Sequence, residues 1–450
     1  MADTERARSR VVATLAAAAV LLAAAPAVAQ PLPRVDGPLT IERAADLAVA
    51  QNLKVKAAGA DARTMDSMRR EALAPFWPQL SANGYFADQR MAPNVYTSAG
   101  TTMVRNYQVF SANQNRDANL TVMYPVFSGG RDYYGYKAAT RRAEAGREMQ
   151  RGAEVDAAMQ ARLDYIGALR EMENLRVTSE LLRQIDERLR ITREAFDAGR
   201  LPRYYVLRDE AERANVVQQQ AAAQSRADFA LVALKTTLGI DLASVVALAD
   251  RLEYARVAAS VDDGIREAAE RQPEIRTAVK QREAAEAEVR AAYGNYFPQV
   301  SLSSMYDWLV AKDRGMPSSN ADGYSVGVVV TLPLFDGFNR ENVLRTTKSK
   351  LERAVQAEAI ARQQITKDVN QAALMLTAAE KAVDASRAGV LQAEEEYRVI
   401  TERFSSGRGL QVEILDAQVV LTRARFNVVN ALADYQSAAA LWLRATGRVR

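Results

Sequence analysis

The segment Phe76-Trp77-Pro78-Gln79-Leu80-Ser81 recurs 220 residues further along the chain as Tyr296-Phe297-Pro298-Gln299-Val300-Ser301. The same shift aligns Asn52-Leu53-Lys54-Val55 with Gln272-Pro273-Glu274-Ile275. Repeats at this distance are much longer than the roughly 20–50 residues of a solenoid unit. The sequence therefore predicts a duplicated half-domain.

A second shift, of 208 residues, relates the later parts of the two copies. It aligns Pro125-Val126-Phe127-Ser128-Gly129 with Pro333-Leu334-Phe335-Asp336-Gly337, and Phe196-Asp197-Ala198-Gly199-Arg200 with Phe404-Ser405-Ser406-Gly407-Arg408. The two shifts differ by 12 residues (220 minus 208), so one loop of the first copy is longer by that number. Residues related by either shift are called repeat equivalents below.

Each copy is predicted to contain a helix, two strands, a long helix, a break and a returning helix. The prolines at 78 and 298 end the first helices and start the strands. The expected organisation is a signal peptide over 1–29; a first repeat over 30–238 with helix 40–74, hairpin 78–127, long helix 131–197 and helix 203–238; an equatorial linker over 239–259; and a second repeat over 260–450 with helix 261–294, hairpin 298–335, long helix 338–404 and helix 410–446.

The N-terminus has the layout of a cleaved secretory signal peptide. Arg6, Arg8 and Arg10 form a basic region, an apolar run extends from Val11 to Ala25, and the small residues Ala27-Val28-Ala29 precede the expected cleavage before Gln30. The alternative is a retained membrane anchor, but the run is shorter than the ~20 apolar residues of a bilayer span. We therefore expect the protein to be exported.

Composition removes several classes of function. The 450 residues contain no Cys and no His, which excludes lipid anchoring, disulfides, zinc sites with thiolate or imidazole ligands, and Cys or His catalysis. The net charge is +4 with 25% charged residues of both signs, which is not a nucleic-acid-binding profile. We expect no enzyme activity, no cofactor, no metal and no nucleic-acid partner.

The strands alternate in polarity with a period of two. The segment Ser325 to Leu334 places Val326, Val328 and Val330 on one side, and the other three predicted strands alternate likewise. About ten alternating residues with terminal aromatics are typical of an outer-membrane strand, although a soluble hairpin with one buried face gives the same pattern. Four such segments on an exported chain favour the membrane.

Each hairpin is followed by a very long helix with a heptad pattern. The stretch from Arg131 to Asp197 contains no Pro, and its apolar spacing from Ala168 to Phe196 recurs from Leu376 to Phe404. A sustained period of 3.5 residues indicates coiled-coil packing against other helices.

Four strands cannot close a membrane barrel, since the smallest known barrels use about eight. An open strand edge in lipid leaves backbone groups without hydrogen bonds, each costing several kcal/mol. If the strands enter the membrane, at least two chains must share one barrel, and the strand count leaves two, three or more chains open.

The segments quoted above, together with Ile414-Leu415-Asp416-Ala417-Gln418, resemble the TolC-like outer-membrane efflux family. The resemblance covers nearly all of 39–447. It implies a mainly α fold with a membrane β-barrel: a homotrimer sharing a twelve-stranded barrel in outer-membrane lipid, with a periplasmic α-helical coiled-coil tunnel below it. It also implies a periplasmic adaptor and an inner-membrane pump as partners. The predicted function is the passive exit duct of a tripartite efflux or type I secretion system; the alternative is a structural periplasmic coiled-coil protein without a pore.

The two helix breaks are predicted to lie at the periplasmic tip. Glycine at a helix C-terminus explains them structurally, and the resemblance implies that the adaptor docks there. The residues concerned are Gly199, Arg200, Leu201, Gly407, Arg408 and Gly409.

By the same resemblance, Glu413 and Asp416 align with an acidic ring that narrows the tunnel entrance. The alternative is that both are solvated acids in a first helical turn, where they favour the helix dipole. Their repeat equivalents are Tyr205 and Arg208, so an Arg208 bridge to Glu413 or Asp416 of a neighbouring coil is a further hypothesis.

Overall fold

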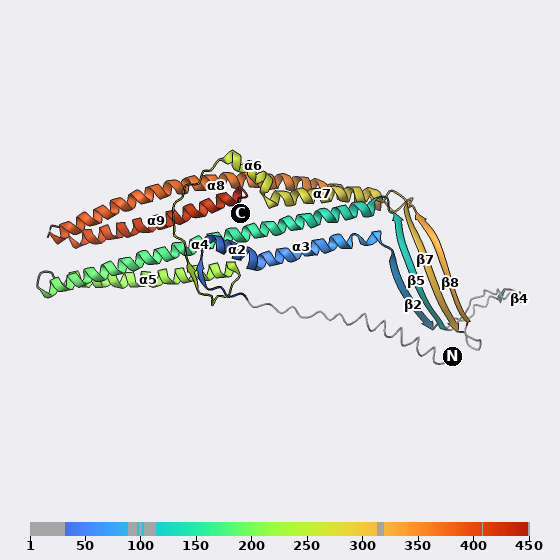
Figure 1. Cartoon of the computed structure of the whole chain (residues 1–450), viewed down its shortest axis with the longest axis horizontal. Helices are drawn as coiled ribbons and strands as arrows, with labels where there is room; N and C mark the ends of the chain where they lie inside the picture. Colours follow the sequence, from blue (N-terminus) through green and yellow to red (C-terminus); the bar gives the residue numbers. More distant parts are fainter. Residues whose placement is uncertain are drawn as a thin grey trace.

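The protein is elongated, with a β-sheet at one end and helical coils running away from it (Figure 1). The computed structural model describes residues 32–88, 97–98, 101–102, 114–312, 319–406 and 408–448. The predicted signal peptide over 1–29 lies outside the described residues. None of the described helices is both long enough and apolar enough to cross a bilayer.

Four strands form one antiparallel sheet in the order β2-β5-β7-β8. Their bounds are Gln79–Asp88, Gln114–Phe127, Gln299–Lys312 and Ser319–Thr331. The two predicted hairpins are therefore joined through β5 and β7. The last strand ends before the predicted Leu334 because Pro333 has no N–H to donate to the ladder. A two-residue ladder joins β3 (Thr97–Ser98) to β4 (Thr101–Thr102).

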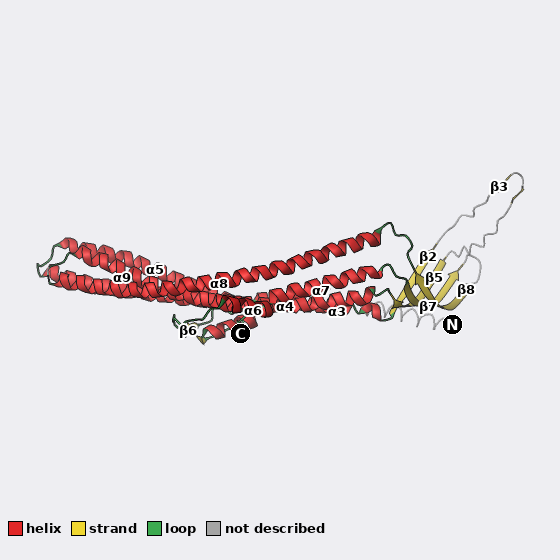
Figure 2. Cartoon of the chain, turned by 90° about the horizontal axis from the view of Figure 1, so that it is seen from above, coloured by secondary structure: helices red, strands yellow, loops and turns green. Residues whose placement is uncertain are grey.

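Two helices of 67 residues extend over the length of the helical part, α4 (Arg131–Asp197) and α8 (Asn339–Ser405). At 1.5 Å per residue each spans about 100 Å. Shorter helices pack along them: α3 (Leu53–Glu71) and α7 (Pro273–Gly294) on the side of the sheet, and α5 (Arg203–Leu238) and α9 (Gln411–Ala445) on the other side (Figure 2).

The helices predicted over 40–74 and 261–294 are each divided in two, at the repeat equivalents Asn52 and Gln272. The first becomes α2 (Ile41–Gln51), α3 and the 3₁₀ turn η1 (Ala74–Phe76), and the second becomes α6 (Val261–Arg271) and α7. The Asn52 side chain donates to the Thr237 carbonyl at 2.7 Å, and that of Gln272 donates to the carbonyls of Arg444 and Ala445 at 2.7 and 2.8 Å. Each break thus hydrogen-bonds the last turn of the returning helix.

On the sheet side, the helices lie side by side in the same order as the strands to which they connect. On the sheet side the contacts run α3-α4-α7-α8, and on the far side they run α5-α4-α9-α8. Consequently α4 has helices on both flanks, whereas α8 lies at an edge throughout. Ile166 of α4 is 1% exposed, while its repeat equivalent Leu374 of α8 is 73% exposed.

The linker over 239–259 crosses the waist of the molecule and is fastened by buried tyrosines. Its strand β6 (Val246–Leu248) pairs in parallel with β1 (Gly37–Leu39). The Tyr165 hydroxyl of α4 accepts from the Asp250 N–H of the linker at 3.3 Å and donates to the Leu39 carbonyl at 2.7 Å, and burial raises the pKa of Tyr165 to about 12. Tyr435 donates to the Ala255 carbonyl at 2.8 Å. The linker therefore contacts helices of both repeats.

A glycine ends α5 where the chain turns into this linker. Gly239 has φ +67°, and a Cβ there would lie 2.6 Å from the Gln51 carbonyl oxygen. Gly199, at φ +69°, has open space around the same position. Replacing Gly199 with Ala should cost roughly 1–2 kcal/mol of backbone strain. Gly239→Ala should cost more because the clash with Gln51 adds to that strain, so its Tm in far-UV circular dichroism should fall further. Equal Tm values would contradict the packing at Gly239.

Candidate functional site at the helix tips

The two helix breaks lie at the same end of the molecule, far from the sheet (Figure 1). Their turns use equivalent hydrogen bonds: Arg200 N–H donates to the Ala195 carbonyl at 2.8 Å, and Arg408 N–H donates to the Arg403 carbonyl at 2.9 Å. Leu201 and Gly409 lie in the same two turns. Gly407, predicted as part of the tip, is outside the described residues.

Each tip carries the same exposed ladder of charges on the long helix. Arg190 pairs with Glu187 and Glu194, and the equivalent Arg398 pairs with Glu395 and Glu402. Hydrogen bonds from the arginines lower the pKa values of Glu187 and Glu395. Exposed pairs of this kind add little stability, so the ladders mainly set the surface charge of the tips.

The predicted entrance residues are distributed over the starts of α5 and α9. Glu413 accepts a hydrogen bond from the Leu410 N–H at 3.1 Å and so caps α9, while Asp416 is exposed. Tyr205 packs its ring 4.2 Å from that of Tyr204, and hydrogen bonding to Tyr205 raises the pKa of Tyr204. Arg208 is exposed. Within the described part of a single chain, no ion pair joins Arg208 to either acid, and the bridge between neighbouring coils stays a prediction.

A buried polar junction near the tip was missed by the sequence analysis. Asp209 of α5 is 0% exposed. Its carboxylate accepts from Arg188 Nε at 3.0 Å, from Thr192 Oγ1 at 2.8 Å and from Gln411 Nε2 at 3.1 Å. Arg188 also bonds to Gln418. The junction therefore joins α4 and α5 of the first repeat to α9 of the second.

The junction is only partly satisfied within one chain. Arg188 Nη2, Gln411 Oε1 and Gln418 Nε2 are buried and have no hydrogen-bond partner among the described residues. A sequence signal for the junction does exist: Asp209 lies three residues after the buried Val206 and seven before the buried Val216, so a carboxylate occupies the apolar stripe of α5.

A second inter-helix contact lies further from the tip. Arg425 of α9 pairs with Glu180 of α4 and with Glu394 of α8, each at 3.2 Å. Together with the Asp209 junction, it attaches α9 to its neighbours at two levels.

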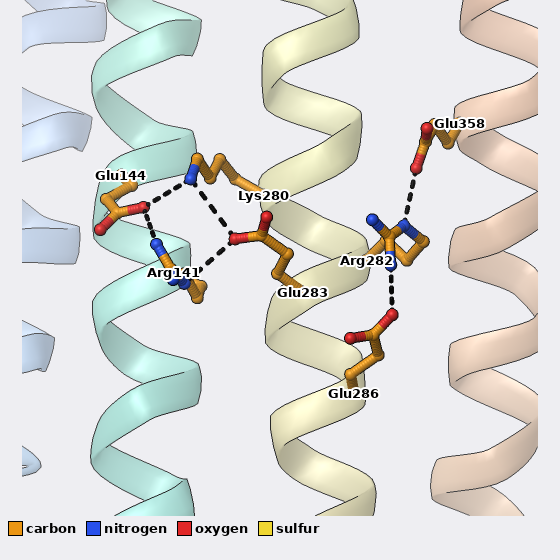
Figure 3. Close-up of polar contacts among 7 residues, drawn as sticks. All are labelled: Arg141, Glu144, Lys280, Arg282, Glu283, Glu286 and Glu358. Atoms are coloured by element: carbon orange, nitrogen blue, oxygen red, sulfur yellow. Dashed lines mark hydrogen bonds and ion pairs between the residues drawn. The ribbon is translucent and has the colours of Figure 1, made fainter.

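On the sheet side, charged side chains join the two repeats across α4, α7 and α8 (Figure 3). Arg141 contacts Glu144 at 2.7 Å and Glu283 at 3.0 Å, and Lys280 contacts the same two carboxylates at 3.0 and 3.3 Å. Burial alone would raise the pKa of Glu144, but Arg141 and Lys280 lower it overall. A separate pair joins Arg282 of α7 to Glu358 of α8 at 2.7 Å (Figure 3).

These clusters hold helices together, and the acids in them are already neutralised by arginine or lysine. Over the described ranges, no group of three or more acidic side chains could hold a metal ion.

Removing the Asp209 carboxylate should destabilise the tip. Asp209→Ala leaves the Arg188 guanidinium buried without its counter-charge, which typically costs about 3–5 kcal/mol. Asp209→Ala combined with Arg188→Leu should recover most of that loss, since apolar replacement of a buried ion pair is often neutral. The control is Asp416→Ala, an exposed acid on α9. The measurement is Tm together with proteolysis of the turn over 198–202; equal values for Asp209→Ala and Asp416→Ala would contradict the prediction.

The repeat architecture matches known proteins over most of the chain. The family model for outer membrane efflux proteins matches residues 44–240 and 264–448, which correspond to the two repeats. The curated relatives include protein CyaE of Bordetella pertussis, 27% identical over 447 residues that cover 95% of this chain and 88% of CyaE. They also include the outer membrane efflux protein BepC of Brucella suis, 24% identical over 410 residues that cover 89% of this chain and 84% of BepC.

Solved structures agree with this assignment at the level of the fold. The Campylobacter jejuni CmeC outer membrane channel superposes with a TM-score of 0.78 at 16% identity, covering 90% of this chain and 85% of CmeC. VceC of Vibrio cholerae gives 0.75 at 18% identity, covering 90% and 96%. The predicted family resemblance and outer-membrane location are confirmed. Because one family model matches both repeats, this protein belongs to the outer membrane efflux protein family and serves as an outer-membrane exit duct.

Proposed function

We propose that three copies of the chain assemble into one channel-tunnel. The observation that carries this proposal is the open wall of the single chain. Within the described residues, β2 and β8 each pair on one side only, and α8 lacks a neighbour along one flank. Three copies contribute twelve strands to one closed barrel and continue the wall of helices into a closed tunnel. The number three rests on the resemblance to the TolC-like family.

The surface of the sheet supports its place in the membrane. Val326, Val328 and Val330 of β8 are exposed in the single chain. Exposed aromatic side chains lie on both sides of these valines: Trp77, Phe297 and Phe335 near the helices, and Tyr306, Trp308 and Tyr324 from the middle of β7 and β8 outward. An apolar band between two aromatic girdles is typical of a barrel wall facing lipid.

The tips at the other end then form the periplasmic entrance. Family members work with periplasmic adaptors and inner-membrane pumps, and we assign adaptor docking to the turns that contain Gly199, Arg200, Leu201, Gly407, Arg408 and Gly409. Residues 1–29 direct export and are removed before assembly. The duct is passive, and the pump supplies its energy and its choice of cargo.

The assembly is tested by expressing the full chain and isolating the outer membrane. In mild detergent the mass from light scattering should be three times that of the mature chain, and planar bilayers should show conductance. Association of several copies follows from the need of β2 and β8 for ladder partners in lipid, and the number three follows from the family resemblance. A folded monomer in lipid would overturn the proposal. An oligomer without conductance would favour the alternative of a structural coiled-coil protein without a pore.

The entrance is tested by removing charge while keeping shape. Three copies bring three Glu413 and three Asp416 carboxylates to one opening, and unit charges about 4 Å apart repel by ~1 kcal/mol in water and ~4 kcal/mol at an effective dielectric near 20. Glu413→Gln with Asp416→Asn should lower the preference for cations in planar bilayers, and the amide introduced by Glu413→Gln keeps an acceptor for the Leu410 N–H. Arg208→Ala should raise conductance if Arg208 neutralises this ring. Unchanged selectivity would return both acids to the role of solvated first-turn residues.

A further inference from the structure

The two long helices are repeat equivalents, but they have different neighbours. In the first repeat α4 contacts α7 and α9 of the second repeat, in addition to its own α3 and α5. Within the described residues, the corresponding flank of α8 faces no helix of its own chain. By the shift of 220 residues α7 is the repeat equivalent of α3, and by the shift of 208 residues α9 is the repeat equivalent of α5. In an assembly of several copies, α8 would therefore make the matching contacts with α3 and α5 of another copy.

The repeat equivalents of the residues in the Asp209 junction have different charges. Arg188 becomes Glu396 on α8, Asp209 becomes Ala417 on α9, and Gln411 becomes Arg203 on α5. In the chain, Arg188 and Gln411 both donate to the Asp209 carboxylate, which lies between them. In the equivalent place between copies, the intervening carboxylate is replaced by a methyl group, and a glutamate faces an arginine directly.

The position of Gln418 in this junction is also compatible with the pairing. Gln418 becomes Glu210 on α5, which would bring a second carboxylate near Glu396. However, Glu210 already pairs with Arg193 of its own chain at 2.5 Å. Glu396 and Arg203 are both exposed, and no ion pair involves either one in the described part of the chain.

The cluster of Figure 3 changes in a parallel way. Glu144 becomes Glu352 on α8, and Glu283 becomes Arg63 on α3. The bridging cations Arg141 and Lys280 become Ser349 and Ala60. Two carboxylates held together by two cations are thus replaced by one carboxylate and one guanidinium of opposite charge, and both are exposed in the single chain.

We propose that α8 of one copy packs against α3 and α5 of the next, with Glu396 paired to Arg203 of the partner subunit and Glu352 paired to Arg63 of the partner subunit. This rests on the proposed assembly and specifies its register. The junctions inside a chain and those between chains then have different charges at the same positions. Because α8 has Glu396 where α4 has Arg188, α8 pairs with Arg203 of the partner subunit. The exposed Leu374 is buried at this contact between copies, as its repeat equivalent Ile166 is buried within the chain.

Charge reversal tests the first pair. Glu396→Arg and Arg203→Glu should each lower the yield of trimer in unheated gels at least several-fold, because each places like charges at the junction between copies. The combined variant, with both changes, should recover most of that yield. Asp384→Arg is the matched control: it makes the same change on α8, and its repeat equivalent Arg176 stays 67% exposed although α4 is flanked on both sides. The pair Glu352→Arg and Arg63→Glu should behave in the same way.

Cross-linking tests the same contact without relying on folding energies. The natural chain has no Cys, so a chain carrying Glu396→Cys and Arg203→Cys has no competing thiols. A short bismaleimide should join copies of this double-cysteine variant into covalent dimers and trimers. With Arg188→Cys and Gln411→Cys, it should instead link a chain to itself without a gain in mass.

The outcomes separate this inference from the proposed assembly. Suppose that the natural chain forms conducting trimers, but the combined charge-reversal variant shows no rescue and the variant with Glu396→Cys and Arg203→Cys gives no covalent oligomer. That result would overturn the inference and leave the assembly standing. A natural chain that stays monomeric in lipid would overturn both. Rescue together with covalent oligomers would establish the register.

Discussion

The structure depends on one constraint, which is that the wall built by a single chain is open along both sides. At the sheet the open edges are β2 and β8, whose outer N–H and C=O groups have no ladder partner among the described strands. Unpaired backbone groups are costly in lipid, where no water is present to form hydrogen bonds with them. Along the helices the same edge is formed by α8, whose apolar flank includes the exposed Leu374. If copies of the chain pair these strand edges, a helix of another copy is also brought against this flank of α8.

Because the chain is a duplication, closure between copies can reuse a kind of contact that already exists within one chain. The contact of α4 with α7 and α9 is an interface between repeats that already lies within the chain. In the proposed assembly the same interface is used again between chains, with the same helix spacing and direction. Charged residues then distinguish the two kinds of interface. Inside the chain, Arg141 and Lys280 neutralise Glu144 and Glu283, and Asp209 lies between Arg188 and Gln411.

At the tips, the contacts that stabilise the helices and the proposed entrance involve the same short segment of chain. Glu413 caps α9 through the Leu410 N–H and is also a candidate for the entrance. The buried Asp209 joins three helices just behind that entrance.

The sequence by itself determined the repeats, the four alternating strands, the two long helices and the family, because these follow from local signals. Period-two and heptad patterns, prolines at strand starts and glycines at helix ends all act on the backbone nearby. Only the tertiary structure decided that α4 is interior and α8 lies at an edge, that Asp209 is buried, and that Asn52 and Gln272 divide the first helices. Each of these depends on a partner that is distant in the sequence, such as Gln411 for Asp209 or the Ala445 carbonyl for Gln272. Such pairings arise from which helix faces meet, and no local pattern specifies that.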